Sequence, residues 1–166
     1  MNSMKRILFF FVHPSKYHLF RYTINELKRR GHTVDIVIIS KDVLEELVKQ
    51  EGWAYTNLFP EGRRSQSTNP FAILWATFIN LFKTIYRLNK YLQNKKYDLF
   101  VTDDCLVLNG WQKGVPSIFF TDNELTTHPE NALLLMAATK VLCPTSVGIS
   151  RFKSKEIDFK VKSRPF

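Results

Sequence analysis

Glycine is scarce in this chain, and none stands where a phosphate-binding loop would need it. The sequence has 6 glycines in 166 residues, and the first strand-to-helix turn, residues 13–18, contains none. Dinucleotide sites and P-loops use glycines there so that the backbone can approach the phosphates. The G-x-S-x-G turn of α/β-hydrolases is also missing from the sequence. Sites of those kinds for NAD, FAD or ATP, and a hydrolase nucleophile elbow, are therefore disfavoured.

Cysteine is scarce too. The two cysteines, Cys105 and Cys143, are far apart in the sequence and lack metal-ligand spacing. His13 and His18 are not four residues apart, as a helical zinc pair would be. We therefore predict no metal site and two buried, reduced thiols, which suits a cytoplasmic protein.

Long apolar runs and acidic residues are also few. No uninterrupted apolar stretch reaches the roughly 18 residues that span a bilayer, and no small-residue cleavage site follows the first apolar run, so we expect neither a spanning helix nor a signal peptide. Lys and Arg number 24 against 15 Asp and Glu, which gives a formal charge of +9. This excess favours an anionic partner, with nucleic acid, an anionic membrane surface and a phosphorylated substrate left open.

Apolar strands alternate with amphipathic helices along the chain. A strand at 7–12, a helix ending at Gly31 and a strand at 34–39 form a βαβ unit. Further strands are predicted at 53–58, 97–102, 115–120 and 140–143, and further helices at 41–52, 70–94, before Gly114 and at 130–139. This alternation predicts a Rossmann-like three-layer α/β/α domain with a mostly parallel sheet of about six strands. The domain is expected over residues 1–145, with 146–166 as a basic tail or a truncated crossover.

Polar side chains gather after three of the predicted strands, in the loops 13–18, 103–105 and 121–128. Such loops meet at one edge of a parallel sheet, where ligands bind. Imidazoles and carboxylates brought together there can act as acids, bases or hydroxyl-binding groups. In the alternative, Ser15 caps the following helix, and Asp103 and Asp122 bond nearby backbone. The candidate residues are His13, Ser15, Lys16, His18, Asp103, Asp104, Asp122, Glu124 and His128.

The predicted helix at 70–94 combines aromatic and aliphatic residues with a basic end. Lys83, Arg87 and Lys90 lie in its second half, and Lys95 and Lys96 follow it, with no acidic residue among them. A basic amphipathic helix with aromatics suits a membrane interface, so these lysines and this arginine are a candidate membrane surface at the inner face. In the alternative, the apolar side packs on the sheet and the basic side chains are solvated.

Several short motifs occur in an order that resembles a known family. His13-Pro14, His18-Leu19-Phe20 and the stretch 26–32 come first, followed by Gly114-Val115-Pro116-Ser117-Ile118 and Thr121-Asp122-Asn123-Glu124. Their sequence resembles the amino-terminal half of domain-of-unknown-function family 354 (DUF354). That family is related to glycosyltransferases of the two-Rossmann-domain type, GT-B, and is similar to UDP-GlcNAc 2-epimerases.

This resemblance implies the acceptor-binding half of a GT-B glycosyltransferase-like or epimerase-like protein, inactive alone. The nucleotide sugar would bind a second domain or partner chain, so no cofactor is expected in this one. By the family pattern, His18 and Glu124 would bind or deprotonate an acceptor hydroxyl. Lys16 stands where the family usually has a histidine, and it could instead hold an anionic group such as a phosphate. The alternatives are a non-catalytic scaffold subunit of a split glycosyltransferase and a basic nucleic-acid-binding domain, although no nucleic-acid recognition motif is present.

Overall fold

The fold alternates strands and helices from end to end. The computed structural model describes residues 3–39, 43–61, 70–122 and 131–143. Within them the order is β1 (Arg6–Phe11), α1 (Pro14–Arg29), β2 (Thr33–Ile38), α2 (Leu44–Gln50), β3 (Thr56–Asn57), α3 (Pro70–Leu92), β4 (Leu99–Thr102), α4 (Leu106–Lys113), β5 (Ser117–Phe120), α5 (Asn131–Ala137) and β6 (Lys140–Leu142). The predicted order of elements is therefore confirmed, whereas the expected tail at 146–166 lies outside the described residues.

All six described strands pair in parallel, in the order β3-β2-β1-β4-β5-β6. The chain builds outward from β1 to one side and then continues from β4 to the other. The connections after β1 and β4 therefore leave the sheet in opposite directions, and a crevice opens between their carboxyl ends. The predicted Rossmann-like α/β class is confirmed.

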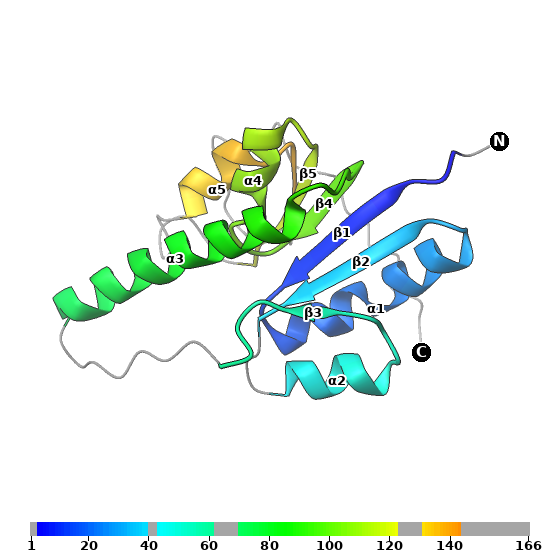
Figure 1. The fold of residues 1–166 in the computed structure, drawn as a ribbon, viewed down its shortest axis with the longest axis horizontal. Coiled ribbons are helices and arrows are strands. Elements are labelled where there is room, and N and C mark those ends of the chain that lie inside the picture. The colour runs from blue at the N-terminus through cyan, green and yellow to red at the C-terminus, as the bar shows by residue number, and fades with distance from the viewer. Residues whose placement is uncertain (1–2, 40–42, 62–69, 123–130, 144–166) are drawn as a thin grey trace.

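β1 is the centre of the sheet and is buried on both faces. Its alternate residues enter two different cores, as the two-residue period of a strand requires. Phe9 and Phe11 belong to the core beneath α1 and α2, whereas Leu8 and Phe10 belong to the core beneath α3 and α4. Figure 1 shows the resulting layers, with α1 and α2 on one face of the sheet and α3, α4 and α5 on the other. A strand covered on both faces must be apolar throughout, which explains the run from Ile7 to Phe11.

Local chemistry sets where two of the helices begin and end. Pro14 occupies the start of α1, and the cap is His13, whose Nδ1 accepts a hydrogen bond from the Ser15 backbone N–H at 3.3 Å. This corrects the expectation that Ser15 caps the helix. At the carboxyl end of α4, Gly114 has φ 67°, a left-handed conformation that suits glycine and ends the helix.

Most predicted elements are shorter in the structure, including those around β3 and α2. The strand expected at 53–58 is reduced to Thr56–Asn57, because Trp53 is buried in the core beneath α1 and α2 and donates its Nε1–H to Asn25 Oδ1 at 2.9 Å. The helix expected from 41 begins at Leu44, with no side-chain cap at Val43. Residues 41 and 42, the expected start of this helix, lie outside the described residues.

Candidate functional site

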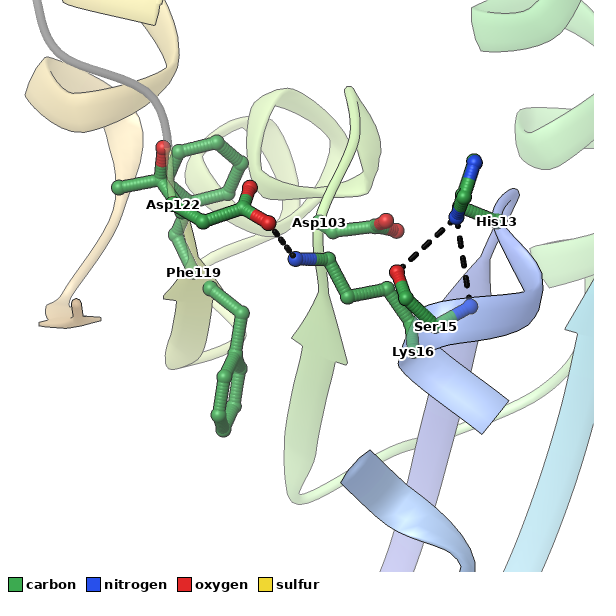
Figure 2. Close-up of a pocket in the computed structure, with 8 residues that line it drawn as sticks. His13, Ser15, Lys16, Asp103, Phe119 and Asp122 are labelled. Carbon is green, nitrogen blue, oxygen red and sulfur yellow. Dashed lines mark hydrogen bonds and ion pairs between the residues drawn. The ribbon is translucent and has the colours of Figure 1, made fainter. Parts of the chain in front are cut away.

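A pocket of about 300 Å³ opens at the carboxyl ends of β1, β4 and β5 (Figure 2). These are the strands that flank the crevice and the next strand outward, where ligands bind in open parallel sheets. Five of the predicted site residues line it together with the end of β5. The lining residues are His13, Ser15, Lys16, Asp103, Phe119, Phe120, Thr121 and Asp122.

Lys16 and Asp122 form an ion pair across the pocket. Lys16 lies in the first turn of α1, and its Nζ is 3.1 Å from Asp122 Oδ2. The Lys16 side chain is 11% exposed and that of Asp122 is 61% exposed. The positive charge of Lys16 therefore lies on the buried side of the pocket, and the negative charge of Asp122 lies toward solvent. Partial burial pushes the pKa of Asp122 upward, but the Lys16 ammonium outweighs it and leaves that pKa below its ordinary value. Asp122 is therefore ionised at neutral pH.

Asp103 follows β4, and its carboxyl is only partly satisfied, by hydrogen bonds with the backbone of Asp103 and Val12. Its Oδ1 is buried and has no hydrogen-bond partner within the described part of the chain. Burial, followed by the neighbouring Asp104 charge, raises the pKa of Asp103 to about 7, although Lys16 acts in the opposite direction. Near neutral pH this carboxyl can therefore either accept or donate a proton. A perturbed carboxyl in a cleft, with a free oxygen, is typical of a functional site.

His13 and Ser15 form the exposed rim of the pocket. His13 Nδ1 lies 3.0 Å from Ser15 Oγ in addition to accepting the Ser15 backbone N–H. Because Nδ1 is occupied in the cap, Nε2 is the ring nitrogen that His13 can offer to a ligand. The rim thus adds polar groups beside the buried Lys16 and Asp103.

Four predicted site residues are not part of this pocket as described. His18 is exposed on α1, and its ring packs edge-on against Tyr17 with 5.0 Å between centroids. Asp104 uses its Oδ1 to accept the Cys105 backbone N–H at 2.6 Å, which ties it to the start of α4. Glu124 and His128 lie outside the described residues. A ligand or catalytic role for these four stays a prediction.

Phe119, Phe120 and Thr121 line the pocket but were not among the predicted site residues. Their position at the end of β5 is the signal that points to them, because this strand ends at the same edge as β1 and β4. Phe120 also meets Phe20 of α1 edge-on, with centroids 4.7 Å apart. An aromatic wall beside charged groups suits a ligand with both an apolar face and polar substituents.

The candidate membrane residues differ from one another in their surroundings. Lys83 and Lys90 are exposed on α3. Arg87 instead pairs with Glu61, with 2.7 Å between Nη2 and Oε1, donates to the Leu58 carbonyl and stacks over the Phe59 ring at 4.2 Å. Arg87 therefore fastens the segment after β3 to α3. None of the described helices has the length and hydropathy of a membrane-spanning segment.

Three or more potential metal-ligating side chains come together nowhere in the described ranges 3–39, 43–61, 70–122 and 131–143. The pocket itself contributes one histidine and two carboxylates, and one of those carboxylates is held by Lys16. These groups can serve as acid, base and partners in charged hydrogen bonds.

The fold is similar to part of several larger solved structures. The chain is similar to a putative UDP-N-acetylglucosamine 2-epimerase from Listeria monocytogenes, with a TM-score of 0.63 and 12% identity, covering 87% of this chain and 40% of that one. It is also similar to the glycotransferase of kitacinnamycin, with a TM-score of 0.59 and 16% identity, covering 86% and 46%. The calicheamicin glycosyltransferase CalG4 gives a TM-score of 0.57 at 15% identity, covering 86% and 48%.

These likenesses concern the fold of the chain. The chain spans less than half the length of each of these three solved structures, as expected for one half of a two-domain fold. It matches no family model and no curated protein sequence. At 12% to 16% identity these likenesses show a shared fold, and the resemblance to DUF354 and to GT-B glycosyltransferases stays a prediction.

Proposed function

We propose that this chain is the acceptor-binding half of a GT-B glycosyltransferase-like enzyme that acts with a second domain or partner chain. The observation that carries the proposal is Asp103, whose free buried Oδ1 and pKa of about 7 lie in the pocket at the ends of β1 and β4. A hydroxyl of the acceptor would donate a hydrogen bond to that oxygen. An ionised carboxyl of this pKa is well matched to take a proton at neutral pH.

In the proposed reaction, Asp103 takes the proton of the acceptor hydroxyl as its oxygen attacks the anomeric carbon of the donor sugar. The bond between that carbon and the nucleoside diphosphate breaks, and the diphosphate leaves with the bonding electrons. The second domain would hold the donor, because the described pocket has no glycine-rich cradle for a diphosphate. His18 and Glu124 stay candidates for additional contacts to the acceptor.

The other end of the pocket suits an anionic substituent on the acceptor. Lys16 is buried on α1, and its Asp122 partner is largely exposed. A phosphate or carboxylate entering beside Asp122 would meet the Lys16 ammonium and the His13 ring at the rim. Charge-assisted hydrogen bonds of this kind are about twice as strong as neutral ones. We therefore propose a sugar-like acceptor with an acidic group.

Binding to the isolated chain tests this proposal without a donor. We expect glucose 6-phosphate to shift the amide NMR signals of Lys16, Asp103 and Asp122 at lower concentrations than glucose does. Lys16→Gln should weaken the phosphate-bearing probe about tenfold and leave glucose unchanged, because one charged hydrogen bond is removed. Lys113→Gln makes the same charge change on an exposed part of α4 and is the matched control. Equal loss in both variants, or shifts that avoid the pocket, would contradict the assignment.

A separate assay tests the need for a second domain. The purified chain with UDP-GlcNAc and an acceptor sugar is expected to show no sugar transfer, since GT-B catalysis takes place between two halves. Robust turnover by this chain alone would overturn that part of the proposal. If a separate chain with the second fold restores transfer, Asp103→Asn should abolish it; a scaffold subunit would tolerate that substitution.

A further inference from the structure

Helix α3 carries two apolar faces, and only one of them packs on the sheet. The inner face contributes Leu88 and Leu92 to the core beneath α3 and α4, with Leu81 and Ile85 packed against it. Five other large apolar residues among those of α3 whose side chains are described are 46% to 70% exposed. They are Trp75, Phe78, Ile79, Phe82 and Tyr86, which we call the outer stripe. Packing on the sheet does not account for these five residues.

The outer stripe is continuous along the helix. At about 100° per residue, its five members fall within an arc of about 100°, and they extend over about 16 Å of the helix axis. In Figure 1 the first part of α3 projects away from the sheet. A row of four aromatic rings and an isoleucine is far more apolar surface than isolated exposed residues provide. Contiguous exposed patches of this kind mark interaction sites.

The charges along α3 are all of one sign. Lys83 and Lys90 are exposed and lie on one flank of the outer stripe, and the sequence of Pro70–Leu92 has no Asp or Glu. Arg87 is not counted, because it pairs with Glu61. A two-fold contact with a second copy would bring these lysines toward lysines, whereas an anionic surface would complement them.

We propose that the outer stripe of α3 docks this domain on the interface of an anionic lipid bilayer. The helix would lie parallel to the membrane, with Trp75, Phe78 and Phe82 in the headgroup–acyl boundary and Lys83 and Lys90 at the anionic headgroups. The proposal stands on α3 alone and does not depend on the acceptor pocket. If that pocket does serve a sugar acceptor, docking would bring it close to membrane-bound acceptors.

Vesicle cosedimentation of the full chain tests the proposal. We expect binding to phosphatidylglycerol–phosphatidylcholine vesicles, little binding to phosphatidylcholine alone, and a steep loss with added salt. Trp75→Gln with Phe82→Gln should reduce binding by about tenfold or more, because the inserted rings are lost. Lys83→Gln and Lys90→Gln should each reduce it about fivefold.

Two matched variants separate docking from general stickiness and charge. Trp111→Gln removes a tryptophan of α4 that is 76% exposed, and Lys113→Gln removes a lysine outside α3; both should bind vesicles like the original chain. In a Trp111→Phe background, the emission of Trp75 should shift to the blue on adding vesicles, while the buried Trp53 stays constant. The proposal is overturned if the chain ignores anionic vesicles, if stripe and control variants lose binding equally, or if the stripe variants instead dissociate a dimer or release a protein partner.

Discussion

The two ends of the sheet treat their charged residues differently. At the amino end, Asp35 accepts hydrogen bonds from Arg6 at 2.8 Å and from Tyr97 Oη at 2.6 Å, and Lys5 pairs with Asp98 at 3.1 Å. At the carboxyl end, Asp103 keeps a buried oxygen that has no partner among the described residues. We call the amino end a closed network, because its charged groups satisfy one another. We call the carboxyl end the open end, because one of its carboxylate oxygens has no partner within the described ranges.

This difference contrasts charges that stabilise the fold with a carboxyl that the fold leaves partly unsatisfied. Burial and the bond to Asp35 raise the pKa of Tyr97, so its hydroxyl stays protonated and keeps donating within the network. Asp103, by contrast, carries an unfavourable buried charge that folding alone does not require. An unsatisfied buried polar group costs stability, and its place in the strand-end pocket gives a reason for tolerating that cost.

Removing the shared acceptor Asp35 from the closed network should cause the largest loss of stability. Asp35→Ala removes the acceptor of both Arg6 and Tyr97, so we expect a loss of about 3 kcal/mol in the free energy of unfolding. Asp98→Ala, at the same end but on an exposed carboxylate, should cost much less, because water screens its pairing with Lys5. Urea denaturation measures both. A loss on Asp35→Ala no larger than that on Asp98→Ala would contradict the account of the amino end.

Neutralising the open end should act in the opposite direction. The pKa of Asp103 is about 7 in the fold against an ordinary value of 3.8, so between these values the folded state holds a proton that the unfolded chain has released. Stability is therefore lost as pH rises from about 4 to about 7. Asp103→Asn should stabilise the protein by about 2 kcal/mol at pH 8 and by almost nothing at pH 4, because the amide carries no buried charge.

Urea unfolding of both proteins across this pH range checks that prediction. A substitution that raises stability and at the same time weakens sugar binding would mark Asp103 as a functional residue. Destabilisation at pH 8 would instead mean that the carboxylate is satisfied and structural.

The smallest effect on stability is expected on the exposed rim. His18→Ala removes a ring that contacts Tyr17 at the surface, and it should change the free energy of unfolding by less than about 0.5 kcal/mol. If His18 touches the acceptor as the family resemblance implies, the binding of glucose 6-phosphate will weaken in the same variant. Unchanged binding would remove His18 from the site, and a large drop in melting temperature would make it structural.

The order of elements could be predicted from the sequence, because the spacing of apolar residues in strands and helices is a local pattern. The run from Ile7 to Phe11, the turn before α1 and the glycine after α4 each determine one boundary without help from distant residues. The predicted boundaries were wrong where tertiary contacts determine them. Trp53, for example, is not part of β3 but packs beside Asn25 and Tyr17. Ser15 failed as a cap because its neighbour His13 already supplies the acceptor.

The location of the site could be predicted from the sequence, but the environment of its side chains could not. Parallel strands bring the ends of β1, β4 and β5 together, so His13, Lys16, Asp103 and Asp122 could be expected near one another. The burial of one Asp103 oxygen depends on how the surrounding side chains pack, which no local sequence pattern shows. The same holds for α3, since apolar spacing did not show which residues turn toward the core and which form the outer stripe.

The central claim is that the carboxyl end of the sheet holds a carboxyl group ready for proton transfer near neutral pH. Titration of the Asp103 side-chain carboxyl carbon by NMR tests it directly, with Asp103→Asn identifying the signal. The account predicts a pKa of about 7 for this group, well above that of Asp122, which Lys16 holds below its ordinary value. An Asp103 that titrates near the ordinary 3.8 would contradict the claim, because the carboxyl would then be a solvated or fully bonded group with no proton to exchange at neutral pH.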